Sequence, residues 1–165
     1  MSSRFETLRL GLSALPEPDA QRVLLFRLLL ASSLELRTRM DRLLADSGLT
    51  TQQAMLLHFL TAEPAPPTLT QFAHQLAMSH QNLKQIATAL ERKGLVEIVV
   101  DERDRRVRRL RLTGAHEALW QQRDPSDFEH VASWTDSLND DEVRSTVAAL
   151  DTLHHALIRS RSAFE

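Results

Sequence analysis

Residues 68–113 read TLTQFAHQLAMSHQNLKQIATALERKGLVEIVVDERDRRVRRLRLT, and this stretch decides the fold. Its pattern predicts a short helix, a turn, a second helix, and two strands joined by an arginine-rich tip. Ser79 is a good N-cap for the second helix, because its hydroxyl can accept a backbone N–H of the first turn. Gly94 follows Arg92 and Lys93 and suits the position where a glycine ends a helix.

The second helix combines an apolar stripe with a polar face. The stripe recurs at i, i+3, i+4 and i+7 and should hold the helix on a core; it consists of Leu83, Ile86, Ala87 and Leu90. The polar face gathers near the N-terminal end and consists of His80, Gln81, Asn82, Lys84, Gln85 and Thr88. Asn and Gln can pair with adenine, and Lys with guanine, so this face suits the major groove of DNA. An ordinary solvated face is the alternative.

The segment after Gly94 predicts a β-hairpin. Val96–Val100 is rich in β-branched residues, and Val107–Leu112 alternates between two faces. The tip between them, DERDRR, carries three arginines and three acids and cannot be core. Beside a helix-turn-helix such a hairpin is a wing, whose arginines can enter the minor groove. We expect Asp104 to orient Arg106. Because the tip sums to zero charge, a soluble hairpin without a DNA role is the alternative.

The run SHQNLKQIATALERKGLV, followed by DERDRRVRRLRLT, resembles the winged helix of the MarR family of transcriptional regulators. The wing signature of that family is an Asp-x-Arg tip ahead of a strand that ends in Leu-Thr, and it is matched by Asp104, Arg106, Leu112 and Thr113. The resemblance is specific over residues 49–113. The chain departs from the family pattern at Glu117, where a glycine is usual, and at Glu102, where a proline is frequent.

This resemblance implies a mostly α-helical winged helix-turn-helix fold, with a three-helix unit, a β-hairpin wing, and N- and C-terminal dimerisation helices. The implied regions are residues 1–48 and 114–165 for dimerisation and residues 49–113 for DNA binding. The implied function is that of a homodimeric regulator, by family default a repressor, on a pseudo-palindromic double-stranded DNA operator.

The residues expected at the DNA are Thr70, Ser79, His80, Gln81, Asn82, Lys84, Gln85, Arg103, Asp104, Arg105, Arg106 and Arg108. We expect base reading from Gln81, Asn82, Lys84 and Gln85. His80 is assigned to a phosphate or a base edge, and Arg106 to the minor groove. The phosphate contacts are assigned to Arg103, Arg105 and Arg108.

Members of the family are often released from DNA by small aromatic or phenolic compounds. The side chains on elements that can line such a pocket are Phe26, His58, Phe59, His116 and Trp120. Aromatic residues at helical spacing are more often core, so core packing is the alternative for each of them. For the whole chain, the alternatives are a winged helix that docks another protein through the same face, and a metal-responsive regulator.

The composition of the chain excludes several classes of protein and site. The chain has 165 residues, a net charge of −2 and no cysteine, so thiolate metal sites, disulfides and thiol switches are excluded. Residues 79–113 hold nine Lys/Arg against five Asp/Glu, whereas residues 114–165 hold four against ten, which is a local basic footprint. No catalytic motif is present, the seven histidines lack metal-ligand spacing, and no cofactor is expected. No apolar run approaches the ~20 residues of a membrane span, and we expect a cytoplasmic protein.

The flanking segments predict further helices. Asp19 is expected to cap a long helix over Ala20–Asp46, whose apolar residues nearly encircle it between Val23 and Leu30. A helix that is apolar all round must be covered on several sides, so we expect a second subunit to bury part of it. Cover by its own chain is the alternative.

The remaining caps and breaks are also predicted. Thr50 and Gln53 form a capping-box pattern ahead of a helix over Leu49–Ala62, Thr70 is expected to cap the next helix, and Thr68 and Leu69 are expected to add a short strand to the wing. After the wing, Thr113 is expected to cap a helix that runs to about Gln122, and Pro125 is expected to interrupt it before a second segment starts at Ser126 or Asp127. Asn139 or Asp140 should cap the last helix, whose apolar stripe is expected to pair with a partner.

Overall fold

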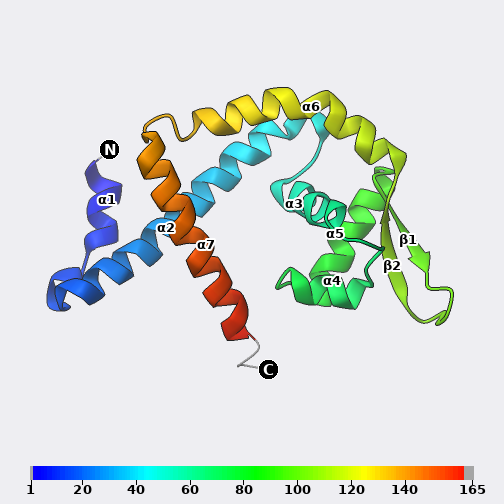
Figure 1. Ribbon diagram of the computed structural model, residues 1–165, viewed down its shortest axis with the longest axis horizontal. Coiled ribbons are helices and arrows are strands. Elements are labelled where there is room, and N and C mark those ends of the chain that lie inside the picture. The colour runs from blue at the N-terminus through cyan, green and yellow to red at the C-terminus, as the bar shows by residue number, and fades with distance from the viewer. Residues whose placement is uncertain (1, 162–165) are drawn as a thin grey trace. The chain divides into compact units, whose positions relative to one another are not determined.

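The computed structural model describes residues 2–161 and is mostly helical (Figure 1). The main elements are α1 Ser2–Arg9, α2 Glu17–Leu43, α3 Thr51–Thr61, α4 Leu69–Gln75, α5 His80–Arg92, β1 Val96–Val100, β2 Arg108–Leu112, α6 Gly114–Ser133 and α7 Asp140–Arg161. Contacts divide the chain into two compact units, with the boundary between Glu117 and Ala118. The first unit holds α1 to β2, and the second holds most of α6 and all of α7.

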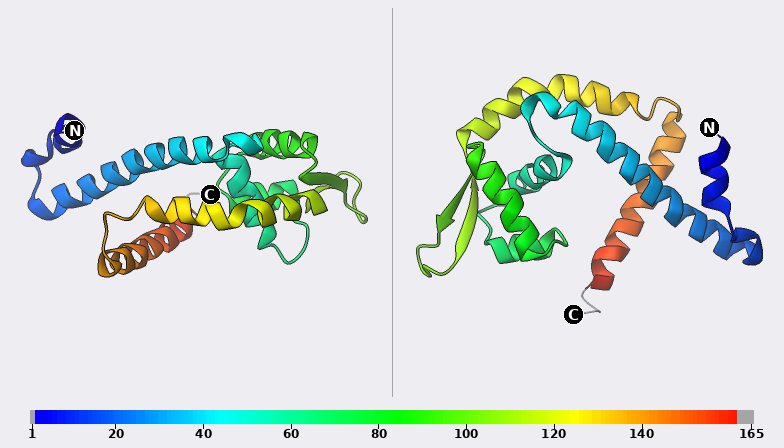
Figure 2. Two further views of the ribbon diagram at one scale, coloured as in Figure 1. Left: turned by 90° about the horizontal axis from the view of Figure 1, so that it is seen from above. Right: turned by 180° about the vertical axis from the view of Figure 1, so that it is seen from behind.

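Helices α3, α4 and α5 and the β1–β2 hairpin form a winged helix-turn-helix, which confirms the predicted fold class. The strands pair antiparallel, in a register that runs from Val96 opposite Leu112 to Val100 opposite Arg108. A single bridge between Thr68 and Arg109 takes the place of the predicted third strand. Both views in Figure 2 show the hairpin projecting from the three helices.

The winged region has a closed core. The largest side chains that are fully buried in the structure are Phe72, Leu44, Leu56, Leu57, Leu83, Leu90, Leu110 and Val96. All but Leu44 lie on α3, α4, α5 or the hairpin. The whole predicted stripe of α5 is buried, which leaves the polar face of that helix outward. Gly94 adopts a φ of 70° just after α5, a conformation that favours glycine and ends the helix as predicted.

The helix caps confirm one prediction and correct another. Thr50 and Gln53 form the predicted capping box at the start of α3, with both hydrogen bonds at 3.3 Å. At α4 the N-cap is Thr68 and not Thr70: the Gln71 N–H donates to Thr68 Oγ1 (3.1 Å) and the Thr68 N–H donates to Gln71 Oε1 (3.2 Å). The reason is that Thr68 has a glutamine at the third helical position, so it closes a reciprocal box.

Helix α2 begins earlier than predicted. It starts at Glu17 with Pro18 in the first turn, so Asp19 is a helical residue and not the cap. Proline is tolerated there because the first turn needs no intrahelical N–H bond. One side of the helix packs in a small cluster with Leu12, Ala20 and Leu24 at its centre. Large apolar side chains remain exposed elsewhere on α2, namely Leu25, Phe26, Leu30, Leu34 and Leu36.

The predicted break near Pro125 is wrong, because α6 is one continuous helix from Gly114 to Ser133. The Arg123 guanidinium forms a two-point ion pair with Asp127 across this position, with Nε to Oδ2 at 3.0 Å and Nη2 to Oδ1 at 3.2 Å. The pair joins the turns on both sides of the missing backbone donor. Thr113 precedes the helix, and its hydroxyl donates to the Gly94 carbonyl oxygen (2.6 Å).

Helix α7 begins as predicted. Asn139 Oδ1 accepts the backbone N–H groups of Asp141 and Glu142, both at 3.0 Å, and the Asn139 N–H donates to Glu142 Oε2 (2.8 Å). No described side chain between residues 118 and 160 is buried. Within the described part of the chain, no helix is long and apolar enough to cross a bilayer.

Candidate nucleic-acid interface

The outward face of α5 carries the first group of predicted site residues. Ser79 is the N-cap as predicted, since the Asn82 N–H donates to Ser79 Oγ (3.1 Å). His80, Gln81, Lys84 and Gln85 are exposed. Within the described residues these four side chains make no hydrogen bond or ion pair, so their polar groups are available to a ligand.

Asn82 differs from its neighbours on this face. Successive helical residues are about 100° apart, so Asn82 lies above Ile86, one turn further on. Ile86 belongs to the buried stripe, and Asn82 itself is half-buried. Gln81 and Gln85 lie one turn apart on the side opposite the stripe. The two glutamines therefore occupy the centre of the outward face, and Asn82 its edge.

The wing tip is ordered by its two aspartates. Asp101 Oδ1 accepts the backbone N–H groups of Arg103 and Asp104, both at 2.9 Å. Asp104 Oδ1 accepts the backbone N–H of Arg106 (2.9 Å). Asp104 therefore positions the backbone of Arg106 and not its guanidinium group, which corrects the predicted contact. In the structure each aspartate closes a local turn of the kind that Asp side chains favour.

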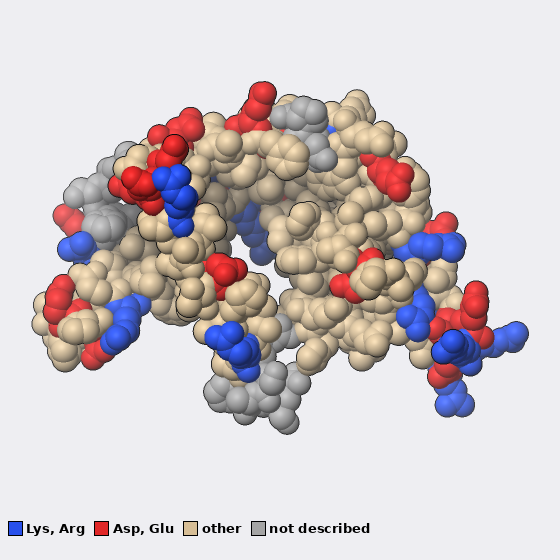
Figure 3. Space-filling model, viewed as in Figure 1, with Lys and Arg blue, Asp and Glu red and all other residues tan. Residues whose placement is uncertain are grey.

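The arginines of the tip are presented outward. Within the described part of the chain, the guanidinium groups of Arg103, Arg105 and Arg106 have no hydrogen-bond or ion-pair partner. Arg108 differs, since its Nη1 donates to the Arg105 carbonyl oxygen (2.7 Å). Figure 3 shows basic and acidic side chains gathered over the tip of the hairpin. The tip is thus highly charged on its surface and regular in its backbone.

A groove joins the helices to the wing. It has a volume of about 610 Å³ and is lined by Thr68, Leu69, Thr70, Gln71, His80, Lys84, Arg106, Val107 and Arg108. We call it the cationic groove, because its described lining includes Lys84, Arg106 and Arg108 and no acid. It brings together five of the predicted site residues from three separate elements. The other seven lie on the first turns of α5 or at the wing tip.

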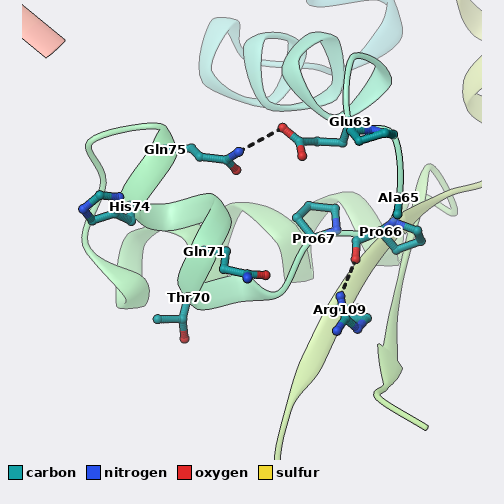
Figure 4. A pocket seen from close by; sticks show the side chains of 10 residues that line it. Glu63, Ala65, Pro66, Pro67, Thr70, Gln71, His74, Gln75 and Arg109 are labelled. Carbon is teal, nitrogen blue, oxygen red and sulfur yellow. Dashed lines mark hydrogen bonds between the residues drawn. The ribbon is translucent and has the colours of Figure 1, made fainter. Parts of the chain in front are cut away.

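Asp101 and Arg109 are functional candidates that sequence reasoning missed. The Arg109 Nε hydrogen-bonds Asp101 Oδ2, and Arg109 Nη1 donates to the Pro66 carbonyl oxygen (2.8 Å; Figure 4). The Arg109 hydrogen bond, followed by the backbone N–H groups of Asp104 and Arg103, lowers the pKa of Asp101 to about 2. The alternation of β2 gives the side of the strand on which Arg109 lies, but no sequence signal pairs it with Pro66.

A second cavity lies on the side of the wing that faces the α3–α4 linker. It has a volume of about 620 Å³ and is lined by Glu63, Pro64, Ala65, Pro66, Pro67, Thr70, Gln71, His74, Gln75 and Arg109. Figure 4 shows the linker prolines and Arg109 on one side and the α4 side chains on the other. The Gln75 side-chain amide donates to Glu63 Oε1 (3.2 Å) across it.

The residues predicted for a small ligand line neither cavity. His58 and Phe59 are neighbours on α3 with ring centroids 5.9 Å apart, and both are exposed, as is Phe26 on α2. His116 is buried and Trp120 is half-buried. The ligand site therefore stays a prediction. Among the residues that the structure describes, no group of three or more His, Asp or Glu side chains is arranged to hold a metal ion.

Comparisons with known proteins agree with this geometry. A sequence model of the MarR family matches residues 47–107. The transcriptional activatory protein BadR of Rhodopseudomonas palustris is 35% identical over 82 residues, which are 48% of this chain and 47% of BadR. The match thus spans about half the length of that relative.

Solved structures match over more of the chain. A MarR protein from Peptoclostridium difficile has a TM-score of 0.75 and 15% identity, over 86% of this chain and 92% of that one. The Staphylococcus aureus MepR–DNA complex has a TM-score of 0.68 and 25% identity, over 81% of this chain and 95% of MepR. The first likeness concerns the fold alone, and the second adds a relative that was solved with DNA.

Proposed function

The chain belongs to the MarR family of transcriptional regulators, and we propose that it binds double-stranded DNA sequence-specifically through the α5 face and the wing. This family and fold are those of regulators and not of enzymes. The observation that carries the proposal is the cationic groove, which joins Lys84 of α5 to Arg106 and Arg108 of the wing. Phosphate backbones are bound by clustered Lys and Arg, and base edges are read by amides on a helix beside them.

The proposal divides the site into two kinds of contact. Base reading is assigned to Gln81, Asn82, Lys84 and Gln85, with the two glutamines at the centre of the face. Phosphate contacts are assigned to Thr70 and Ser79 at the helix starts and to Arg103, Arg105 and Arg108 in the wing. His80 is assigned to either a phosphate or a base edge. Arg106 is assigned to the minor groove, where focused negative potential attracts arginine.

We propose that the chain acts as a homodimer. Helix α2 carries Phe26, Leu30 and Leu34 at i, i+4 and i+8, so they form one stripe, and their exposed fractions are 59%, 51% and 69%. A contiguous exposed apolar stripe along a helix marks a candidate interaction surface in a soluble protein. A two-fold dimer would place its recognition helices about 34–36 Å apart and read a pseudo-palindrome.

The proposed outcome of binding is repression, because a dimer seated on an operator excludes other proteins from the DNA it covers. Activation is the second candidate, since the relative BadR carries the name of an activatory protein. Release by a small aromatic or phenolic compound is part of the proposal as well. A reporter gene placed behind the selected operator, with and without the protein, distinguishes repression from activation.

The test is fluorescence anisotropy of the purified protein on a selected pool of duplexes, at two salt concentrations. We expect enrichment of a two-fold symmetric motif and an affinity that falls steeply with salt. Weak, sequence-independent binding would favour the protein-docking alternative instead.

Three variants then separate the two kinds of contact. Asn82→Ala or Gln85→Ala should cost ~1–3 kcal/mol on the selected motif and relax its specificity, whereas Arg105→Ala should weaken all sequences alike. Equal losses on specific and random DNA for both amide variants would contradict the assignment of base reading to this face.

A further inference from the structure

We propose that Arg109 is a positioning residue that clamps the wing to the α3–α4 linker and so keeps the cationic groove in its DNA-binding geometry. This inference rests on the proposed function. It differs from that function because Arg109 would act through the wing and not by touching DNA. Its partners are Asp101 at the base of the wing tip and Pro66 in the linker.

The contacts of Arg109 join two parts of the chain that are distant in sequence. Its Nη1 donates to the Pro66 carbonyl oxygen at 2.8 Å, and its Nε hydrogen-bonds the Asp101 carboxylate. The next residue of the strand adds a third connection, since the Leu110 N–H donates to the Pro67 carbonyl oxygen (3.0 Å). Strand β2 is therefore held against the segment that leads directly into the α4 N-cap, Thr68.

Adjacent residues of β2 face different cavities. Arg108 lines the cationic groove, whereas Arg109 lines the cavity beside the linker. Side chains of successive strand residues point to opposite faces, so the DNA-facing side of the wing is the side away from Arg109. In addition, the Asp101 carboxylate already pairs with the charge of Arg109. Arg109 is therefore poorly placed to be one more phosphate contact.

Asp101 connects the clamp to the tip. Its Oδ2 binds Arg109, while its Oδ1 accepts two backbone N–H groups of the tip, from Arg103 and Asp104. The Asp101 side chain is 11% exposed and the Arg109 side chain 37%. One carboxylate thus fixes the tip backbone and the clamp at the same time. Through it, the linker, the strand and the outward arginines form one hydrogen-bonded assembly.

The clamp requires a guanidinium group. Arg109 uses two nitrogens of one planar group on two acceptors that come from different segments. A lysine ammonium is a compact point charge on a flexible stem and does not reproduce this fixed fork. Fixing the wing before binding lowers the conformational entropy lost when DNA binds, which is how a residue outside the interface raises affinity.

The first test depends on whether a substitution raises or lowers the affinity for DNA. Asp101→Asn removes a negative charge beside the DNA-binding surface, so electrostatics alone predicts tighter DNA binding. The clamp predicts weaker binding, because the tip and Arg109 lose their common carboxylate. We expect the affinity for the selected operator to fall roughly tenfold, the equivalent of about 1.4 kcal/mol. Tighter binding by Asp101→Asn would overturn the proposal.

The second test compares two arginines of the same strand. Arg109→Gln should weaken operator binding roughly tenfold. Its matched control is Arg111→Gln, which removes the same charge from a residue that pairs with Glu97 across the hairpin and, within the described residues, makes no hydrogen bond or ion pair with the linker. That control should stay within about twofold of the wild type, since surface ion pairs contribute little. Equal losses in the two variants would overturn the clamp.

Two further measurements exclude a purely electrostatic or purely folding effect. Arg109→Lys keeps the charge, and we expect it to bind as weakly as Arg109→Gln; restored affinity would overturn the clamp. The slope of log affinity against log salt should be unchanged in Arg109→Gln, whereas a lost phosphate contact lowers it by about 1. Circular dichroism checks that each variant is folded.

If the wild type itself fails to bind any duplex selectively, the proposed function fails, and not the clamp alone.

Discussion

The winged region and the α6–α7 helices of the second unit differ in how far their apolar side chains are buried. The winged region buries Leu56, Leu57, Leu83, Leu90 and Leu110 to a relative exposure of 0%. By contrast, no described side chain of residues 118–160 is buried. The first region therefore completes its core within one chain, whereas the described residues 118–160 of the second unit form no buried core.

Two helices with similar sequence patterns make this contrast concrete. Both α5 and α7 carry an apolar stripe at three- and four-residue spacing. The stripe of α5 is covered by α3, α4 and the hairpin, whereas on α7 the side chains of Val147 and Leu157 are 61% and 57% exposed. An amphipathic pattern states which face will be covered, but not which molecule covers it.

The largest expected effect comes from opening the core of the winged region. Leu83→Ala should lower the free energy of unfolding by ~2–5 kcal/mol, because it removes a fully buried side chain and leaves a cavity. Urea unfolding followed by circular dichroism measures this loss, and it should not depend on protein concentration. The comparison variant is Leu157→Ala on α7, whose effect should be largest at high protein concentration, where a dimer is populated, and should vanish on dilution. The same concentration dependence in both variants would break the contrast between the two regions.

The next effect concerns self-association through α2. Phe26→Glu should weaken the dimer at least roughly tenfold, since it places a charge within an apolar stripe that a partner would bury. Sedimentation velocity over a dilution series measures the shift. Ser32→Glu is the control, because it adds the same charge to an exposed residue on a different side of the helix. A monomeric wild type would remove the basis of the homodimer proposal.

Sequence reasoning was most successful where the determinants are local. The Ser79 cap, the buried stripe of α5, the glycine at position 94 and the two strands are as predicted, because each depends on residues within a few positions. The wing contacts were harder to predict. The Arg109 to Pro66 hydrogen bond spans 43 residues of sequence, and neither residue belongs to a motif that signals the other.

The wrong predictions concern competition between local signals. Thr68 and Thr70 both suit an N-cap, and the glutamine at position 71 decides for Thr68 by closing the box. Proline at position 125 signals a break, but the Arg123–Asp127 pair and the remaining hydrogen bonds keep α6 continuous. At both positions a specific side-chain contact outweighs the local helix-capping or helix-breaking propensity.

Replacing the two threonines tests the corrected cap directly. Thr68→Ala should lower the stability of the winged region by ~1 kcal/mol, because it removes the side-chain acceptor of the capping box. Thr70→Ala, an exposed site within the same helix, should change stability by less than about 0.5 kcal/mol. Urea unfolding of the two variants measures the difference. Equal losses would restore Thr70 as a cap candidate and contradict the observed box.

The smallest effect is a change of stability with pH in the acid range, and it concerns the charges that order the wing. The pKa of Asp101 lies at about 2 in the folded chain, mainly because of the Arg109 hydrogen bond, against ~3.9 in an unfolded chain. Because the folded pKa is the lower one, the stabilisation is complete above pH ~4 and is lost as the pH falls from there toward ~2. Asp101→Asn lacks this titrating group. Its stability deficit relative to wild type should therefore be constant at neutral pH and shrink over that acid window.

Thermal unfolding of both proteins at intervals between neutral and acid pH measures the deficit. The control is Glu102→Gln at the same tip, whose exposed carboxylate makes no hydrogen bond within the described residues. This variant keeps the Asp101 carboxylate, so the loss of stability in acid that is assigned to Asp101 should remain. A deficit that stays constant into strong acid would mean that the Asp101 carboxylate is not bonded in solution as it is in the structure. The winged region would then have a buried apolar core but a tip without these hydrogen bonds. It would differ from the second unit only in the burial of its apolar side chains.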